Sequence, residues 1–131
     1  MNALYAMLER GRPWVLSILR IVAALLFLEH GLAKVFGFPV AGPPLGGLLI
    51  VAAVLETIGA ALVLVGAWTR LVAFLLSGEM AVAYFMAHEP KSFYPLVNGG
   101  ESAVLFCFVF LYLVFAGGGP LSVDRLVLKQ R

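Results

Sequence analysis

The stretch Trp14–Phe36, WVLSILRIVAALLFLEHGLAKVF, decides the fold class. An α-helix needs about 20 mostly apolar residues to cross a hydrocarbon core about 30 Å thick, and this stretch is long enough. It lacks the apolar–polar alternation of a barrel strand, so we expect a transmembrane helix. Three similar stretches follow, separated by turn-rich segments. The four predicted spans are Trp14–Phe36, Leu45–Trp68, Arg70–Ala87 and Ser102–Ala116.

Composition supports an all-α membrane protein. Of the 131 residues, 63% are hydrophobic and 12% charged, whereas soluble domains have about 45–50% apolar and about 25% charged residues. This excludes a soluble globular enzyme and makes the lipid bilayer the expected surroundings. Four spans leave only short connections, so residues 1–131 are expected to form a single four-helix transmembrane domain. No basic run indicates a nucleic-acid partner, and the single cysteine, Cys107, cannot form an internal disulfide.

The basic residues predict the orientation of the bundle. With both termini in the cytoplasm, seven Lys and Arg side chains lie on the inner side and two on the outer side, which satisfies the positive-inside rule. The inner set is Arg10, Arg12, Arg20, Arg70, Arg125, Lys129 and Arg131, and the outer set is Lys34 and Lys91. We therefore predict an N-in, C-in topology. Both tails are expected to lie at the interface, with Ser122 capping a short C-terminal helix.

Three ionisable residues fall well inside the predicted spans: Arg20, Glu56 and Glu79. Such groups cost about 2.5–3.5 kcal/mol each on insertion scales, so they usually face the bundle interior. Arg20 and Glu79 are predicted at similar depth, which is compatible with a buried ion pair. Glu56 is flanked by small residues that let a neighbouring helix approach. This charge cluster is either a structural clamp that fixes the bundle register or a catalytic or proton-relay group.

A second polar group is predicted at the outer mouth of the bundle. Its candidate ligand-binding residues are His30, Lys34, Tyr84, His88 and Glu101. These side chains could hold a quinone head group, which needs hydrogen-bond donors and a proton source above an apolar slot, or they could hold an anion. Alternatively they are ordinary interfacial residues. Leu105, Phe108, Tyr112 and Phe115 form a stripe on the last span that either walls such a slot or only packs.

Other cofactor signals are weak. His30 and His88 are expected at similar depth, which is sterically compatible with a haem, but two histidines alone do not indicate one. The sequence contains no Glu-x-x-His pair for a di-iron centre and no phosphate loop, catalytic triad or dinucleotide motif. We therefore expect no metal site and no intrinsic cofactor, while quinone binding is compatible with the polar mouth.

Several motifs, in order along nearly the whole chain, resemble the DoxX family of small four-helix membrane proteins. They are Gly31–Gly37 (GLAKVFG), Glu56–Gly59 (ETIG), Gly66–Arg70 (GAWTR), Met80 with Ala83 and Tyr84, Asn98–Glu101 (NGGE) and Gly117–Asp124 (GGGPLSVD). The resemblance implies a group that includes the DoxD-type subunit of a thiosulfate–quinone oxidoreductase. It also implies assembly with soluble redox enzymes at the bacterial inner membrane. It does not fix the reaction of this chain.

The leading hypothesis is a bacterial inner-membrane subunit of a quinone-linked redox system, with a periplasmic polar mouth and electrons supplied by an extrinsic partner. If the chain takes part in catalysis, the resemblance implies an oxidoreductase subunit. A second hypothesis is a non-catalytic membrane scaffold or assembly factor for extrinsic redox enzymes. A third is a small-solute or proton carrier, which the mid-membrane carboxyls would favour. Homodimerisation through small-residue faces is compatible with each of these hypotheses.

Overall fold

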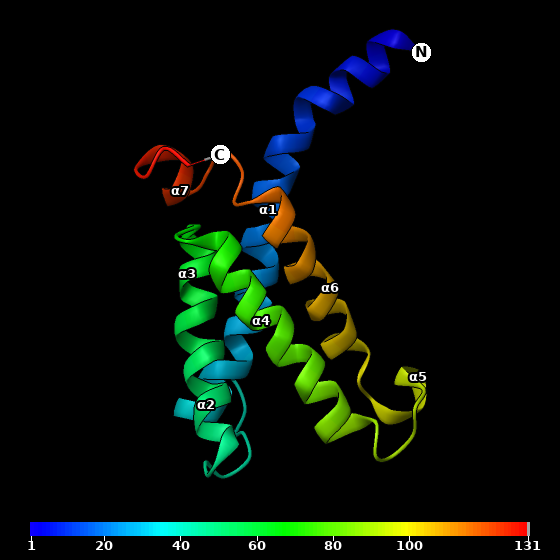
Figure 1. The fold of residues 1–131 in the computed structure, drawn as a ribbon, viewed down its shortest axis with the longest axis vertical. Coiled ribbons are helices and arrows are strands. Elements are labelled where there is room, and N and C mark those ends of the chain that lie inside the picture. Colours follow the sequence, from blue (N-terminus) through cyan, green and yellow to red (C-terminus); the bar gives the residue numbers. More distant parts are fainter. Residues whose placement is uncertain (131) are drawn as a thin grey trace.

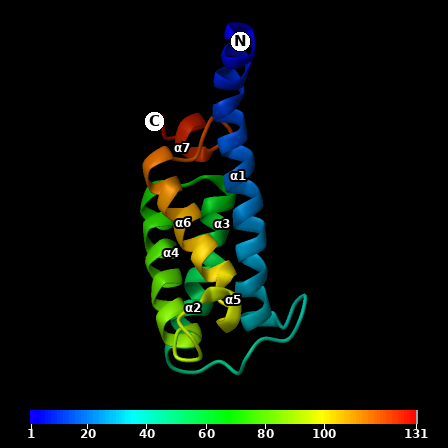
Figure 2. The ribbon, with the colours of Figure 1, turned by 90° about the vertical axis from the view of Figure 1, so that its right-hand side faces the viewer.

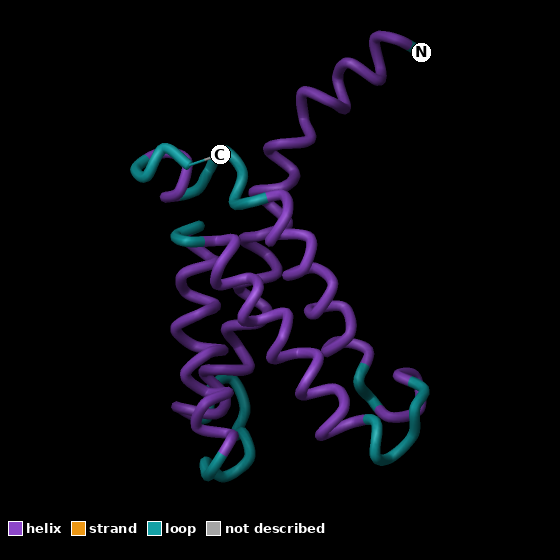
Figure 3. Tube along the Cα trace, in the orientation of Figure 1, coloured by secondary structure: helices purple, strands orange, loops and turns teal. Residues whose placement is uncertain are grey.

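A computed structural model describes residues 1–130, and within that range the ordered elements are helices, without strands. Four helical rods pack side by side (Figures 1 and 2). The first rod is α1 (Asn2–Phe36), and the second joins α2 (Leu48–Val54), the π-helical turn η1 (Leu55–Gly59) and α3 (Ala60–Val65). The third rod joins α4 (Thr69–Ala83) to the π-helical turn η2 (Tyr84–His88), and the fourth is α6 (Glu101–Ala116). Two single-turn helices, α5 (Pro95–Asn98) and α7 (Val123–Leu126), lie in the loops and tail, and Figure 3 shows the longer connecting loops at the end of the bundle away from the two termini.

Three helices among the described residues are long and apolar enough to cross a membrane: Asn2–Phe36, Leu48–Val65 and Thr69–His88. The fourth rod, α6, is apolar but has 16 residues, which corresponds to about 24 Å at 1.5 Å per residue. The chain is thus an all-helical, multi-pass membrane protein. The predicted fourth crossing and the predicted orientation stay predictions.

The observed helices differ from the predicted spans at three ends. The first helix begins at Asn2, before the predicted span, and continues beyond the bundle (Figure 1); the alanines, leucines and methionine of residues 3–8 favour a helix, and Pro13 lies within it. The second rod begins at Leu48 and ends at Val65, inside the predicted span. Prolines and glycines precede its start, and Gly66 ends it in the left-handed conformation with φ 74°.

The core lies between the four rods. α4 packs most extensively against α6, and α1 against α3. Phe27 of α1 is fully buried and meets Phe110 of α6 edge-on, with ring centroids 4.9 Å apart. Leu76 of α4 and Val63 of α3 complete the same cluster and are also fully buried.

The outer surface of the rods is apolar. Large aliphatic and aromatic side chains are about half exposed or more on every rod, among them Val22, Leu26, Val54, Ile58, Phe74, Phe85, Leu105 and Phe108. A soluble monomer rarely exposes such a continuous apolar surface. In this protein it is the surface that contacts lipid.

The two ends of the bundle differ. The N-terminus, the tail with α7 and the turn between α3 and α4 lie at one end, which we call the terminal end (Figures 1 and 2). The loops of residues 37–47 and 89–100 lie at the other, which we call the loop end. The predicted cap is confirmed: Ser122 Oγ accepts a hydrogen bond from the Arg125 N–H at 3.2 Å. Arg131, one of the predicted cytoplasmic charges, lies outside the described residues.

Candidate functional site

A cavity of about 640 Å³ opens in the loop-end half of the bundle. Residues of α1, α2, η1, α4, η2 and α6 line it, and most of them are aliphatic or aromatic. The ionisable residues in the lining are His30, Lys34, Glu56, Glu79 and His88. A cavity of this size, with mostly apolar walls and a few polar groups, is typical of small-molecule sites, whose volumes run from about 300 to 1,000 Å³.

Lys34 and Glu56 form an ion pair in the cavity wall. The Lys34 ammonium donates a hydrogen bond to Glu56 Oε2, and the two side chains are 15% and 5% exposed. Removing one partner from a buried pair leaves an uncompensated charge, so each residue holds the other in place. The sequence placed Lys34 in the mouth and Glu56 in a separate charge cluster, whereas the structure joins them.

Two glycines let neighbouring helices approach Glu56. A Cβ at Gly31 of α1 would lie 2.7 Å from the Thr57 backbone nitrogen, and a Cβ at Gly59 would lie 2.9 Å from a methyl carbon of Leu76. Neither position has room for a larger side chain. The close approach of α4 to this part of the second rod agrees with the predicted small-residue face around Glu56.

Glu79 of α4 also lines the cavity. Both of its carboxyl oxygens are buried, and neither accepts a hydrogen bond from an N–H or O–H group of the described residues; the Glu56 carboxyl lies close enough to share a hydrogen bond with Glu79 when one of the two is protonated. Glu79 is close enough to Glu56 and Lys34 to interact with both electrostatically. Native proteins pair the great majority of buried polar atoms, so a buried carboxyl that lacks such a donor and faces a cavity calls for a functional explanation.

π-helical turns carry two of the polar cavity residues. Glu56 lies in η1 and His88 ends η2. A π-turn inserts one extra residue into a helix and changes which side chains face a neighbour, and such turns are frequent at functional sites. Sequence periodicity at 100° per residue could not reveal this change, because it assumes a regular α-helix.

The two histidines each use one ring nitrogen within the protein. His30 Nδ1 lies 3.2 Å from the Leu26 carbonyl oxygen, and His88 Nδ1 lies 3.2 Å from the Asn98 carbonyl oxygen. A carbonyl only accepts, so each Nδ1 carries the hydrogen in this contact. The Nε2 atom of each ring is then the one to interact with a ligand. The His30 ring packs edge-on against Phe106 of the cavity wall, with centroids 5.7 Å apart.

Tyr84 and Glu101, two of the predicted mouth residues, are not among the residues that line the cavity. Tyr84 is buried, and its hydroxyl donates to the Phe93 carbonyl and accepts from Asn98 Nδ2 at 3.1 Å. Glu101 is exposed at the start of α6. Asn98 was missed by the sequence reasoning. It is buried and bonds to Tyr84, to the Ser92 carbonyl and to the Gly100 N–H, so it organises the loop beside the mouth.

The predicted ion pair between Arg20 and Glu79 is wrong. Arg20 lies at the terminal end, where its guanidinium donates to the carbonyls of Gly118 and Leu121, the latter at 2.6 Å. The C-terminal tail folds back across the bundle end and supplies these acceptors. Depth along the membrane normal was the only basis for the predicted pair, and depth does not determine which way two helices turn their side chains.

The aromatic stripe does not wall the cavity. Leu105, Phe108 and Phe115 are more than 60% exposed, and they face away from the bundle. Phe106 is the α6 aromatic residue in the cavity lining, and Phe110, one turn later, is fully buried in the core. α6 is apolar on all sides, so periodicity could not identify its inner face.

Comparisons with known proteins agree with the resemblance seen in the sequence. Residues 15–89 match the DoxX family, and this range includes all five ionisable residues of the cavity. A Haemophilus influenzae protein described as uncharacterized is 43% identical over 134 residues, which cover 94% of this chain and 98% of the relative. No solved structure matches the chain. The chain therefore belongs to the DoxX family.

Proposed function

We propose that this DoxX-family membrane protein is the quinone-binding subunit of a quinone-linked redox system, with the loop-end cavity as its quinone site. The single observation that carries the proposal is Glu79, whose two buried carboxyl oxygens face a mostly apolar cavity and accept from no N–H or O–H group of the described residues. A ligand with a polar head and an apolar body would supply the missing partner and fill the rest of the space.

The polar groups of the cavity match the needs of a quinone head. Each quinone carbonyl oxygen accepts hydrogen bonds, which the Lys34 ammonium can donate, whereas Nε2 of His30 and of His88 accepts from a quinol hydroxyl when the ring is neutral and donates to a quinone carbonyl when the ring is protonated. Glu79 can accept a hydrogen bond from a ring hydroxyl when ionised and donate one when protonated. Conversion of a quinone to a quinol takes two electrons and two protons, and a carboxyl beside the ring is suited to proton transfer.

The remaining walls suit the apolar part of the ligand. Leu48, Val51, Leu55 and Met86 face the cavity from the second and third rods. Val51 and Met86 are also more than half exposed on the outer surface. The cavity is thus bordered by the same side chains that contact lipid, which gives an isoprenoid tail a direct path into the bilayer.

We assign electron delivery to an extrinsic redox protein. Cys107 is the single cysteine of the chain and cannot form a dithiol pair. A bound quinone would supply the two-electron chemistry, and the residues of this chain would bind it, orient it and exchange protons with it. The family resemblance to subunits that assemble with soluble redox enzymes supports this division of roles.

We further propose four membrane crossings with both termini in the cytoplasm of a bacterial cell and the cavity mouth on the periplasmic side. The charge distribution supports this topology, as does the position of both described ends at one end of the bundle (Figure 2). Reporter fusions at the C-terminus and in the loop of residues 89–100 test it. A periplasmic signal from the C-terminal fusion would contradict it.

Equilibrium dialysis with short-chain ubiquinone and menaquinone analogues tests the quinone site. We expect saturable binding of one analogue per chain, weakened by Glu79→Gln and Lys34→Gln and unchanged by Glu101→Gln. Glu101 is the matched control because it is exposed and absent from the cavity lining. Absence of binding by the folded protein, or equal weakening by all three variants, would overturn the proposal and leave the scaffold hypothesis in its place.

A proton or small-solute carrier is the second candidate. The same Glu79 favours it, because a carboxyl beside an ion pair in a membrane cavity can take part in a proton relay. A pH-sensitive dye inside proteoliposomes distinguishes the two functions. Proton uptake that occurs without added quinone and is lost in Glu79→Gln would favour the carrier.

A further inference from the structure

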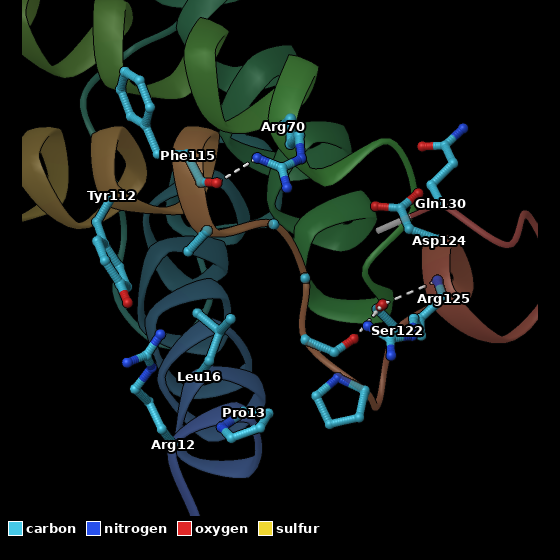
Figure 4. Close-up of a pocket in the computed structure, with 15 residues that line it drawn as sticks. Arg12, Pro13, Leu16, Arg70, Tyr112, Phe115, Ser122, Asp124, Arg125 and Gln130 are labelled. Atoms are coloured by element: carbon cyan, nitrogen blue, oxygen red, sulfur yellow. Dashed lines mark hydrogen bonds between the residues drawn. The ribbon is translucent and has the colours of Figure 1, made fainter. Parts of the chain in front are cut away.

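A second cleft, of about 450 Å³, lies at the terminal end of the bundle and shares no lining residue with the quinone cavity. Figure 4 shows its position between α1, the start of α4, the end of α6 and the tail that leads into α7. Its walls come from three parts of the chain that are far apart in the sequence: residues 12–16, Arg70 and residues 112–130. It is therefore a product of the tertiary structure.

The charge in this cleft is predominantly positive. Three arginines line it, Arg12 from α1, Arg70 from α4 and Arg125 from α7, together with one acid, Asp124. The Asp124 carboxylate is already used: its oxygens accept from the Trp68 and Thr69 N–H groups at 2.7 and 2.9 Å. Asp124 is also buried, and three arginines against one aspartate leave the lining with a net charge of +2.

Two of the arginines differ in how they are held. Arg70 donates to the carbonyls of Val114, at 2.9 Å, and Phe115, the last turn of α6. Gly117 lies against its guanidinium, where a Cβ would come 3.2 Å from Nη2. Arg125 is exposed, and among the described residues its guanidinium has no ion pair or hydrogen bond. One arginine is thus fixed at the cleft wall and another can move toward a ligand.

Arg12 has a weak partner of its own. It forms an exposed ion pair with Glu9 at 3.1 Å, one turn earlier on α1. Such a surface pair contributes about 0–1 kcal/mol. An anion held by several arginines could therefore replace Glu9 as the partner of Arg12 at a small cost in free energy. The side chains that surround the opening in Figure 4 include Arg12 and Arg70 on opposite walls.

The depth of the cleft matches the lipid headgroups. Trp14 and Trp68, the two tryptophans of the chain, both lie at this end and are 52% and 55% exposed. Tryptophan is enriched at the level of the headgroups in membrane proteins. Tyr112 and Phe115 of α6 line the same cleft and are exposed on its membrane side. Acyl chains of a lipid bound there would lie along these rings.

We propose that this cleft binds the phosphate of an anionic phospholipid, through Arg12, Arg70 and Arg125. Guanidinium groups bind phosphate oxygens bidentately, and basic pockets between membrane helices on the cytoplasmic side bind anionic head groups. A free phosphate has the same chemistry, but it has no acyl chains to place against Tyr112 and Phe115. The proposal is independent of the quinone site and of electron transfer.

Native mass spectrometry of the detergent-solubilised protein, titrated with phosphatidylglycerol or phosphatidylcholine, tests this inference. We expect one phosphatidylglycerol to be retained per chain and phosphatidylcholine to be retained more weakly. Arg12→Gln and Arg125→Gln should each weaken retention about fivefold, the loss of one near-surface cationic contact. Arg10→Gln is the matched control: it removes the same charge from an exposed position outside the cleft lining. Neither tested arginine supports the core, so these variants are expected to fold.

Three results would overturn the assignment. The first is equal retention of the two lipids. The second is equal weakening by Arg10→Gln, which would indicate general surface charge and no specific site. The third is complete displacement of the lipid by millimolar inorganic phosphate, which would make free phosphate the ligand. Quinone binding measured on the same variants should be unchanged, so failure here is distinguishable from failure of the proposed function.

Discussion

Arg20 and Glu79 both hold their charged groups inside the bundle, but the surroundings of the two groups differ. Arg20, at the terminal end, is 1% exposed and donates to carbonyls of the C-terminal tail. Glu79, toward the loop end, has two buried oxygens without a donor among the described residues and faces a cavity. The free-energy cost of placing a charged side chain in the membrane does not explain this difference, because it is high for both residues.

This difference in bonding assigns a structural role to Arg20 and makes Glu79 a candidate ligand-binding residue. Arg20 is held by backbone acceptors and lies beside Ser17, whose hydroxyl accepts from the Leu121 N–H at 3.1 Å. Both terminal nitrogens of Arg20 are hydrogen-bonded within the protein, and its Nε is the one guanidinium nitrogen without a partner among the described residues. The Glu79 oxygens accept from no N–H or O–H group of the described residues, and the cavity beside them leaves space where a ligand fits. The same kind of residue therefore stabilises one half of the bundle and makes the other half receptive to a ligand.

The largest effect is expected at Arg20. Arg20→Met removes charged donors from the carbonyls of Gly118 and Leu121, and each such bond is worth about 1.5–3 kcal/mol, so unfolding should become easier by about 4 kcal/mol. Titration with dodecyl sulfate in mild detergent micelles measures the change. Arg10→Met, at an exposed position, is the control and should be near neutral. A neutral Arg20→Met would remove the contrast between the two ends.

The Lys34–Glu56 pair comes next. Glu56→Gln leaves the Lys34 ammonium uncompensated and should lower the free energy of unfolding by about 3 kcal/mol. The double variant Lys34→Met with Glu56→Met removes both charges and should recover most of that loss. The same dodecyl sulfate titration measures the free energy of unfolding of the single and the double variant. Additive losses in the double variant would show that the two residues do not act as a pair.

Glu79 is the residue for which stability and binding should separate. Glu79→Gln keeps the shape and removes the charge, so the free energy of unfolding should change by less than about 1 kcal/mol. Quinone affinity should fall about tenfold, which corresponds to 1.4 kcal/mol. Dialysis and unfolding are measured on the same preparation. A large loss of stability with unchanged affinity would make Glu79 structural, as Arg20 is.

A smaller loss is expected at Asp124, which caps α4 from the tail. Asp124→Ala removes the acceptor for the Trp68 and Thr69 N–H groups and should cost about 1 kcal/mol. Thermal unfolding followed by circular dichroism measures the effect. Quinone binding should be unaffected because Asp124 is at the opposite end from the cavity. An equal loss of quinone affinity would mean that the two ends are coupled.

The smallest effect is expected at Glu101. Its side chain is exposed at the start of α6 and absent from the cavity lining. Glu101→Gln should change the free energy of unfolding by less than about 0.5 kcal/mol and leave quinone affinity unchanged. Loss of quinone affinity in this variant would show that the mouth of the site includes the start of α6, as expected for Glu101 from the sequence.

Much of the candidate site could be predicted from residue type and spacing. His30, Lys34 and His88 were predicted at one mouth, and all three line the cavity. The ion pair between Lys34 and Glu56 was not predicted. Depth in the membrane says nothing of the distance between two helices, and Gly31 lets α1 approach the backbone beside Glu56 closely. Tyr84 was assigned to the mouth because it lies one helical turn before His88, and Glu101 because it begins the last span on the same side of the membrane.

By itself the sequence determined that this chain is a multi-pass, all-helical membrane protein of the DoxX family, since the length of the apolar stretches, the composition and the order of the motifs can all be read without a structure. It also determined which few ionisable residues had to be accounted for. The tertiary structure alone decided what each one does. The returning tail gives Arg20 its acceptors, and two π-turns and two close helix contacts direct Glu56 and His88 to the cavity that Glu79 faces. Partners of a buried charge come from other segments, and a linear pattern does not contain their positions.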